Sequence, residues 1–431
     1  MTEQQICGVL LTRGTESVVG GHCNRTGRPV DGSILVVPSL NPGLYDALMT
    51  ARAVVCSSGG RTGHMHSICR AKGIPVLRVD PIDLDKIVGE VTLDLERGSV
   101  ILGAAGNARA APTNPTGAPP DGLGSACAVI ADLRDIRGLN SSGPCAARVE
   151  SFFLREEFLC LFAALSPIDA LRGGTAVNAY GRAVAEQLQA CVEALLPGQR
   201  LILRMLDLRS DDAAYITEEA AVPREPNPDM GLHGTRWLLR SATYPQALHV
   251  MRETLHERLG AEADRVHLSA PFVTDAEEFA KLRPHLGLPT ETPLSAFIET
   301  PAAVHSTSAI CAAGADELFV GTKDLVQFYL AADRSNHLVA DSYRTRHPAV
   351  LDGLRRVIED ARDAGTPTRL FALGADLAYY LERLPTPTGY MMCVSELQHV
   401  LQPPRGDHPP EVPLPINLTR QGAGPAPSCQ A

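Results

Sequence analysis

The chain has 431 residues, of which 45% are hydrophobic and 20% charged, a composition typical of globular proteins. This length allows two or three domains, for instance a barrel of about 250 residues and a smaller module. The formal net charge of −10 argues against a general binder of nucleic acids or anionic membranes, because both need a basic surface. Small anionic substrates remain compatible with this charge.

Cysteine usage and hydropathy bear on where the protein works. The eleven cysteines are scattered without a C-x-x-C pair, and no secretory signal precedes them. This usage predicts free thiols in a reducing compartment, so we expect a cytoplasmic protein without disulfides. No apolar run reaches the roughly 18 residues that span a bilayer, and the cysteine spacing excludes a zinc ribbon or finger.

Residues 1–104 are expected to form a small β/α domain with short strands around one helix. Apolar runs bounded by turn residues predict strands at Ile6–Leu11, Ser33–Pro38, Ala53–Ser57, Pro75–Val79 and Glu90–Leu95.

The most informative stretch of this domain follows the strand expected at Ala53–Cys56. The chain there passes through a glycine-containing loop, Ser57–Gly63, into a helix expected to begin at His64. Glycines allow a bulky anion to approach the backbone, and the free amides at a helix start favour negative charge. A neutral histidine at this point is a nitrogen nucleophile that can accept a phosphoryl group and pass it on. From spacing alone, a polar cap or a metal ligand, paired with His66 in an H-x-H pattern, is an equally good interpretation.

The rest of the chain is expected to form a linker, a barrel and a tail. Residues 105 to about 125 are rich in Pro, Gly and Ala without periodicity, so we expect a mobile linker within 105–140. Over 141–402, short apolar runs alternate with amphipathic stretches, which predicts βα repeats closing into a (β/α)8 barrel. The proline-rich residues 403–431 are expected to be a disordered or surface-lying tail. The expected fold class is therefore α/β. Barrel strands are expected at Leu201–Asp207, Val266–Val273, Ser295–Glu299, Glu317–Thr322, Leu370–Leu373 and Tyr390–Ser395.

Two carboxylates follow neighbouring strands of the expected barrel. Glu299 ends one strand and Asp324 follows the next, and the chemistry of such barrels gathers at the C-terminal ends of the strands. Two converging carboxylates can hold one Mg²⁺, which takes its remaining ligands from water and substrate oxygens. Taken by themselves, such carboxylates are more often salt-bridge or cap residues than metal ligands.

The stretch around His64 resembles a known family. The pattern Gly-Gly-x-Thr-x-His at 59–64, a helix, and Gly-Ile-Pro at 73–75 is similar to the phosphohistidine helix of phosphoenolpyruvate-utilising enzymes. This family includes enzyme I of the sugar phosphotransferase system, phosphoenolpyruvate synthase and pyruvate phosphate dikinase. Residues 32–38 and 91–94 resemble flanking strands of the same swivelling domain. The resemblance implies that His64, rather than His66, carries the phosphoryl group.

Barrel motifs extend the resemblance in the family's order. The stretches 297–303 and 319–327 look like the motifs in which Glu299 and Asp324 would bind Mg²⁺, with Mn²⁺ possible. Residues 332–336 resemble a motif whose arginine, here Arg334, contacts the substrate. The stretches 153–159 and 203–207 resemble motifs that place Arg155 and Arg204 in the phosphate and carboxylate clamp, a role that suits a bidentate guanidinium. The resemblance thus implies a catalytic set of His64, Arg155 and Arg204.

The departures from the family pattern fall on chemistry. His233 stands in place of an arginine, Lys323 in place of an asparagine, and both are expected to contact substrate beside Arg155, Arg204 and Arg334. Acidic Asp211-Asp212 replaces a lysine. No cysteine occupies residues 370–376, where the family has the thiol that protonates the enolate. Cys393 is the nearest substitute, although a buried cysteine that packs as a small hydrophobe is the favoured interpretation.

The resemblance implies a diverged phosphoenolpyruvate-dependent phosphotransferase-like enzyme. We expect phosphoryl transfer between phosphoenolpyruvate, or a related phosphorylated small molecule, and His64, with a separate acceptor that the sequence does not identify. The chain has no room for an ATP-grasp domain or for the helical domain that meets a carrier protein. Two alternatives stay open, namely a family member with altered enolate chemistry and a non-catalytic phosphoenolpyruvate-binding regulator. The resemblance also implies a homodimer formed through the barrel.

Overall fold

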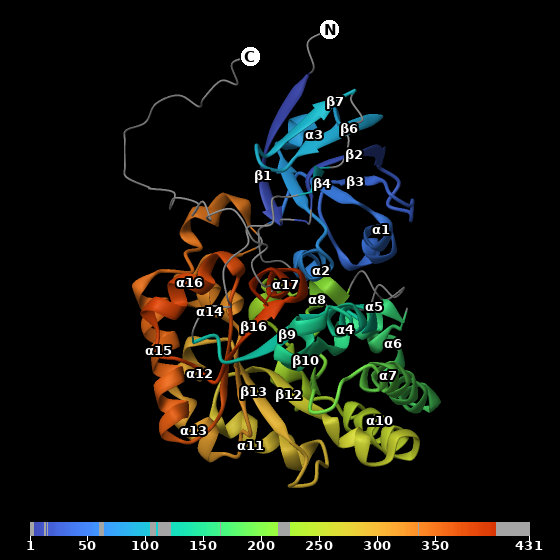
Figure 1. Cartoon of the computed structure of the whole chain (residues 1–431). Helices are drawn as coiled ribbons and strands as arrows, with labels where there is room; N and C mark the ends of the chain where they lie inside the picture. Colours follow the sequence, from blue (N-terminus) through green and yellow to red (C-terminus); the bar gives the residue numbers. More distant parts are fainter. Residues whose placement is uncertain are drawn as a thin grey trace.

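A computed structural model of the chain shows two α/β domains, with the N-terminal domain placed over one end of a barrel (Figure 1). The structure describes residues 4–12, 14, 16–59, 64–103, 109–110, 122–163, 165–213, 225–334 and 336–401. The predicted fold class, a small β/α domain followed by a (β/α)8 barrel, is confirmed.

The N-terminal domain is built on one mixed sheet. Within the described ranges its strand order is β3-β4-β5-β1-β7-β6-β2-β8, with β2 also pairing with β3. The parallel part, β3 to β5, carries buried Val, Ile, Leu and Cys on both faces, as expected for strands covered on both sides. The strands are β1 (Gln5–Thr12), β2 (Glu16–Asn24), β3 (Ile34–Val37), β4 (Ala53–Cys56), β5 (Val76–Val79), β6 (Glu90–Asp94), β7 (Ser99–Leu102) and β8 (Arg109–Ala110).

Three helices accompany this sheet, namely α1 (Tyr45–Thr50), α2 (His64–Lys72) and α3 (Pro81–Leu84). The sequence anticipated α2, which begins at His64 as expected. Helix α2 buries Met65, Ile68 and Cys69 against the sheet, at the spacing of one helix face. Its opposite side lies over the barrel in Figure 1. The side chain of His64 and residues 60–63 lie outside the described part of the chain.

The second domain is a closed parallel barrel. Its described strands follow one another in chain order around the barrel, and β16 pairs with β9 to close it. They are β9 (Ser125–Ile130), β10 (Val149–Arg155), β11 (Arg200–Arg204), β12 (Val266–Val273), β13 (Leu294–Ile298), β14 (Leu318–Val320), β15 (Thr368–Phe371) and β16 (Gly389–Cys393).

Helices cover the outside of the barrel. They are α4 (Leu133–Asn140), α5 (Glu156–Phe162), α6 (Pro167–Ala170), α7 (Thr175–Glu193), α8 (Ser210–Ala213), α9 (Gly234–Leu238), α10 (Tyr244–Leu259), α11 (Ala276–His285), α12 (Pro301–His305), α13 (Thr307–Ala312), α14 (Thr322–Leu330), α15 (Pro348–Asp363), α16 (Gly374–Arg383) and α17 (Val394–Leu401).

Alternate side chains along the barrel strands belong to two separate hydrophobic cores. Side chains of a strand alternate between its faces, so Phe153 points into the barrel while Phe152 and Leu154 pack under the outer helices. The interior is an aromatic layer, in which the ring centroid of Phe153 lies 5.3 Å from those of Phe297 and Phe319. The barrel is therefore filled beneath its mouth, the end where the strands finish.

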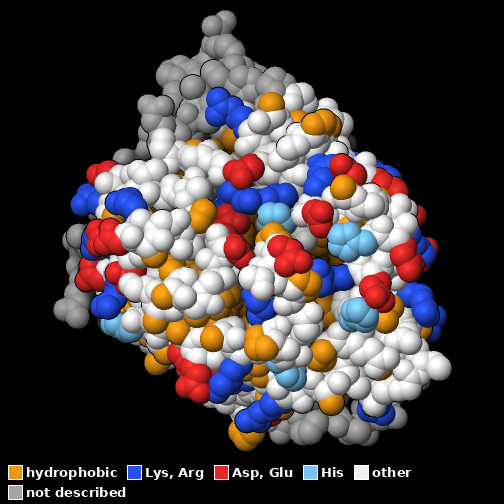
Figure 2. Space-filling view, turned by 90° about the horizontal axis from the view of Figure 1, so that it is seen from below, with side chains coloured by type: hydrophobic (Ala, Val, Ile, Leu, Met, Phe, Trp, Pro, Cys, Tyr) orange, Lys and Arg blue, Asp and Glu red, His pale blue; other side chains and the backbone are white. Residues whose placement is uncertain are grey.

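The opposite end of the barrel, its floor, is held by paired charges. Arg369 is 1% exposed, and its Nε donates to Glu317 at 2.5 Å while its Nη1 donates to Ser125 Oγ at 2.7 Å. Its Nη2 pairs with Glu150 at 2.9 Å. Figure 2, which views this end from outside, shows acidic and basic side chains interspersed with small apolar areas.

The linker expected over 105–140 is shorter than predicted. Strand β9 and helix α4 both lie inside that interval, and β9 pairs with β10 and β16. The apolar run Ala126–Ile130 is the physical reason, because it supplies a fully buried barrel strand directly after the glycines. Residues 111–121 and the tail at 403–431 lie outside the described residues.

Among the helices that are described, none is long and apolar enough to cross a membrane.

Candidate active site

Three of the predicted site residues lie at the barrel mouth, because side chains alternate between the two faces of each strand. Arg155 follows the interior residue Phe153 by two positions, Arg204 follows Ile202, and Glu299 follows Phe297. Each therefore points to the interior side at the end of its strand. All three are buried, with exposed fractions of 8%, 2% and 2%, respectively.

The two predicted metal ligands lie close enough to repel one another. Glu299 lies directly after β13, and Asp324 is in the first turn of α14 after β14. Burial raises the pKa of Glu299 well above its ordinary range, and the charge of Asp324 raises it further. Gly321 makes room for this carboxylate, since a Cβ there would lie 2.8 Å from Glu299 Oε1.

Arginines surround the acidic pair. Arg334 Nη1 lies 2.9 Å from Asp324 Oδ2, and Arg209 Nη2 lies 3.1 Å from Asp324 Oδ1. Glu299 Oε2 accepts a hydrogen bond from the backbone N–H of Phe272 at 3.1 Å. Across the ranges that the structure describes, no group of three or more His, Cys, Asp or Glu side chains forms a metal cluster. Any ion at this pair would complete its shell with water or ligand oxygens.

The two expected clamp arginines differ in the partners of their guanidinium groups. Arg204 has two close carboxylate partners, with Nη2 at 2.5 Å from Glu157 Oε1 and 3.1 Å from Asp207 Oδ2, although its Nε is buried without a hydrogen-bond partner. Arg155 instead stacks over the Phe158 ring at 5.2 Å, and its Nε is buried without a hydrogen-bond partner. Burial, followed by the charge of Arg204, lowers the pKa of Arg155 to about 10. Both arginines therefore keep a buried Nε donor for an anion, and Arg204 differs in that its Nη2 is paired with two carboxylates.

Arg334 also keeps unused donors. Its Nε and Nη2 are buried and have no partner, while its Nη1 holds Asp324. A buried guanidinium nitrogen without a partner is costly, and an anion that fills the mouth would satisfy it.

His233 is held by protein groups on both ring nitrogens. Its Nδ1 lies 2.8 Å from Asp207 Oδ1 and its Nε2 lies 3.0 Å from the carbonyl oxygen of Asp229. Burial opposes the imidazolium, but the charge and hydrogen bond of Asp207 raise the pKa of His233 above its ordinary value. In this geometry His233 braces Asp207, which in turn holds Arg204.

Sequence reasoning missed Arg209 and Glu157. Arg209 pairs with Asp229 and Asp324. It lies two positions before Asp211-Asp212, the acidic pair that departs from the family pattern. Glu157 pairs with Arg204, and its second oxygen is buried without a partner. Both are charged residues in the segments that follow strand ends at the mouth, Glu157 after β10 and Arg209 after β11, and this placement was the signal that could have identified them.

Lys323 links the mouth to the N-terminal domain. Its Nζ donates to Ser67 Oγ on α2 at 2.8 Å and lies 4.6 Å from the centre of the Phe371 ring. None of the ion pairs found in the described ranges involves this lysine, although it is only 6% exposed. Burial lowers its pKa to about 7, and the charges of Arg155 and Arg70 act in the same direction.

Further polar contacts fix α2 on the barrel. Arg70 Nη1 lies 3.1 Å from Glu396 Oε1, and Lys72 Nζ lies 2.8 Å from Asp132 and 2.9 Å from Asp135. The hydroxyl of Ser395 donates to the carbonyl of Arg70. These partners belong to the ends of β9 and β16, so α2 lies across the mouth.

His66 and Cys393 are enclosed within this arrangement. His66 is 4% exposed with an unpartnered Nε2, and burial followed by the charge of Arg70 lowers its pKa to about 4. Cys393 faces the barrel interior beside Phe371, is fully buried, and burial raises its thiol pKa. The histidine is thus neutral and the thiol protonated near pH 7.

Both domains match families of known proteins. Residues 147–373 match the family described as "PEP-utilising enzyme, PEP-binding domain", and residues 29–98 match "PEP-utilising enzyme, mobile domain". A probable phosphoenolpyruvate synthase of Archaeoglobus fulgidus is 25% identical over 82% of this chain and 47% of its own length.

Two further relatives show the same pattern. The phosphoenolpyruvate synthase of Pyrococcus furiosus is 26% identical over 79% of this chain and 42% of its own length. A phosphoenolpyruvate-protein phosphotransferase of Haloferax volcanii is 27% identical over 77% of this chain and 59% of its own. The chain spans about half the length of the curated relatives it matches. With a mobile domain docked on a barrel of the matching family, the chain belongs to the PEP-utilising enzymes.

Proposed function

We propose that the protein transfers a phosphoryl group between phosphoenolpyruvate, or a related phosphorylated small molecule, in the barrel mouth and His64 on α2. The observation that carries this proposal is the contact of Lys323 with Ser67. Position 64 precedes Ser67 by one helical turn, and positions three apart lie on the same face of a helix. The face of α2 that carries position 64 is therefore the one turned toward the mouth.

Cations in the mouth would bind the anionic substrate. Arg155 and Arg334 carry unsatisfied donors, and Lys323 is a buried amine with no carboxylate partner in the described part of the chain. Arg204 is held in place by Glu157, Asp207 and, at 3.8 Å, Glu299, so it contributes a fixed positive charge at the same site. Preorganised charges of this kind stabilise the charge that develops in phosphoryl transfer.

Glu299 and Asp324 are the residues that would hold a Mg²⁺ ion. The raised pKa of Glu299 beside Asp324 fits such a role, because a divalent cation between two carboxylates removes their repulsion. The ion would neutralise phosphoryl charge when it is bound. Mn²⁺ has the same preference for hard oxygen ligands and could replace it.

The transfer step needs few protein groups. A neutral ring nitrogen of His64 attacks the phosphorus, the bond from phosphorus to the enol oxygen breaks, and the electron pair of that bond leaves on the enolate of pyruvate. The clamp cations hold the departing enolate oxygen. The phosphoryl group then passes from His64 to an acceptor that binds elsewhere.

Intact-mass analysis tests this proposal. The parent protein, incubated with phosphoenolpyruvate and Mg²⁺, is expected to gain one acid-labile phosphoryl group. His64→Ala should gain none, while His66→Gln should still be labelled. Labelling of His64→Ala to the level of the parent would contradict the assignment, and ATP and other phosphorylated metabolites run in parallel would reveal a different donor.

A second candidate is a family member with altered enolate chemistry. It is favoured by the chain itself, since residues 370–376 contain no thiol and Cys393 is fully buried. A general acid must reach the carbanion within hydrogen-bond distance. We expect slow formation of pyruvate, measured as solvent deuterium in the product. Rapid formation in both the parent and Cys393→Ala would exclude this candidate.

Two further aspects of the protein belong to the same proposal. A homodimer formed through the barrel is expected from family membership, and gel filtration with light scattering would test it. The dense polar contacts of α2 with the barrel make a purely regulatory phosphoenolpyruvate binder the weaker alternative, because binding alone requires no docked histidine helix.

A further inference from the structure

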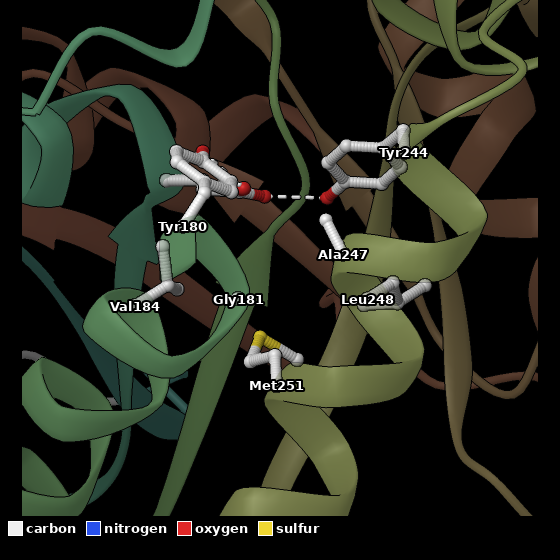
Figure 3. Close-up of a pocket in the computed structure, with 8 residues that line it drawn as sticks. Tyr180, Gly181, Val184, Tyr244, Ala247, Leu248 and Met251 are labelled. Atoms are coloured by element: carbon white, nitrogen blue, oxygen red, sulfur yellow. Dashed lines mark hydrogen bonds between the residues drawn. The ribbon is translucent and has the colours of Figure 1, made fainter. Parts of the chain in front are cut away.

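A buried carboxyl group lies just behind the barrel mouth. Glu156 is the first residue of α5, directly after Arg155, and is 2% exposed. Its side chain points away from the mouth into a crevice between α7 and α10. Figure 3 shows this crevice, with Tyr180 of α7 and Tyr244 of α10 facing each other at its upper end.

Glu156 joins four elements of the fold. Its Oε1 accepts a hydrogen bond from the Tyr180 hydroxyl at 2.6 Å, and its Oε2 accepts one from the Tyr244 hydroxyl at 2.5 Å, the dashed line in Figure 3. The backbone of Leu206, which follows β11, is a further group close to the carboxyl, and its influence favours the ionised form. Helices α7 and α10 approach closely here, since a Cβ on Gly181 would lie 2.5 Å from the carbonyl oxygen of Ala247.

The surroundings of Glu156 have no room for water, and no cation pairs with it among the described residues. The crevice has no room for a water molecule, and the titratable groups that face the carboxyl are Tyr180, Tyr244, Cys160 and Glu157. None of the ion pairs formed by the described residues includes Glu156. Burial raises its pKa to about 7, against the effect of the tyrosine hydrogen bonds, and the charge of Glu157 raises it further.

The hydrogen-bond count favours the ionised form. A carboxylate only accepts, and here it meets two hydroxyl donors, with the backbone of Leu206 beside them. Protonation would place a further hydrogen among them, so one tyrosine hydroxyl would lose the carboxylate as its acceptor. No water can enter the crevice to replace that acceptor, and the sulfur of Cys160, 3.3 Å from the Tyr180 hydroxyl, is a weak acceptor. The contacts should therefore loosen when Glu156 takes up a proton.

The elements that Glu156 joins are those that carry the clamp. Arg155 precedes it in sequence, and Leu206 lies two positions after Arg204, the last residue of β11. We propose that ionised Glu156 is a positioning residue that fixes the ends of β10 and β11, and with them Arg155 and Arg204, in the arrangement that binds an anionic substrate. The substrate part of this inference rests on the proposed function.

Hydrogen exchange of the full-length protein tests the positioning role without any ligand. Protection of peptides covering 150–158 and 200–208 is compared at pH 6 and pH 8, after correction for intrinsic exchange. The parent should lose protection at pH 6, whereas Glu156→Gln, which cannot ionise, should show the same protection at both pH values. Met251→Ala is the matched control, because it loosens the far end of the crevice without touching the hydrogen bonds.

A second variant covers the case in which Glu156→Gln does not fold. Tyr244→Phe removes a single donor to the carboxylate, so the pH at which protection changes should move upward. Equal pH dependence in the parent and Glu156→Gln, or the Glu156→Gln pattern in Met251→Ala, would overturn the proposal. So would an unchanged midpoint in Tyr244→Phe.

Calorimetry with phosphoenolpyruvate and Mg²⁺ tests the link to substrate. At pH 8, Glu156→Gln should bind about tenfold more weakly than the parent, as expected when a supporting residue is lost, and in turnover KM should rise more than kcat falls. At pH 6 the two proteins should differ little. If the parent does not bind phosphoenolpyruvate, the proposed function fails while the exchange result still decides the role of Glu156. Binding by Glu156→Gln equal to the parent at pH 8 would remove the connection to the clamp.

Discussion

The two ends of the barrel differ in how completely their buried charges are paired. On the floor, every guanidinium nitrogen of Arg369 has an acceptor, supplied by Glu317, Glu150 and Ser125, and the neighbouring Arg200 shares both carboxylates, although its Nε has no partner. At the mouth, Arg155 and Arg334 keep unpartnered nitrogens and Lys323 has no carboxylate partner among the described contacts. Buried charges that are fully paired serve the fold, whereas buried cations left unsatisfied are arranged for something that binds.

Replacing one arginine at each end should separate the two roles. Arg369→Ala leaves Glu317 and Glu150 with Arg200 as their remaining cation, so the free energy of unfolding should fall by about 3 kcal/mol. Arg155→Ala removes a cation that lacks a full set of partners, so stability should hold while labelling by phosphoenolpyruvate slows about 100-fold. Urea denaturation and labelling rates measure both. Equal loss of stability in the two variants would erase the distinction between the ends.

Lowering the pH should destabilise the folded protein, because His66 would have to take up a proton beside the cations of the mouth. The pKa of His66 is about 4 in the folded protein, lowered first by burial and then by Arg70, Lys323 and Arg78. The unfolded chain takes up the proton near pH 6.5, so stability is retained above that value and lost as the pH falls toward 4. The loss from this group should reach up to about 3 kcal/mol. Denaturation of the parent and His66→Gln at pH 7 and pH 5 checks this, and parallel losses would refute it.

Neutralising the carboxylates of the mouth should weaken metal binding. Glu299→Gln and Asp324→Asn each remove one charged oxygen ligand, so Mg²⁺ affinity in the presence of phosphoenolpyruvate should fall about tenfold. Calorimetric titration measures this, with Glu317→Gln on the floor as the control. Unchanged affinity in both mouth variants would show that the ion binds elsewhere.

Removing the unpaired lysine should have the smallest effect. Lys323→Met keeps much of the side-chain volume and eliminates a buried ammonium, so the free energy of unfolding should rise by about 1 kcal/mol. Labelling of His64 should slow by about fivefold, because the hydrogen bond to Ser67 is lost. Thermal denaturation and labelling rates test both parts. A drop in stability would mean that Lys323 is paired in solution.

Much of the fold could be predicted from the sequence. The apolar runs that gave β12 and β13 are long and end in polar residues, so their boundaries were clear. Strand β9 was missed because it follows a Pro/Gly-rich stretch and contains small residues, which resemble a linker in composition. β2 was missed because two glycines and several polar residues interrupt its pattern.

The candidate site was only partly accessible from sequence. Arg155, Arg204 and Glu299 were found through motifs, and their convergence follows from strand parity, which the sequence contains. The inward orientation of Cys393 follows from the same parity once the bounds of β16 are known. The pairing of Arg209 with Asp324 and of Lys323 with Ser67 joins residues more than one hundred positions apart. Such pairs depend on how loops and domains meet, which local patterns do not encode.

Helix α2, lying over the mouth, has a consequence for the order of events in time. Lys323, Arg334 and Glu299 are nearly inaccessible in this arrangement. Under the proposed function, a donor molecule or its product could therefore exchange with solvent only when the two domains part, so each cycle would require them to part and rejoin. The turnover rate should then be limited by domain motion rather than by the chemical step. It should therefore fall as solvent viscosity rises.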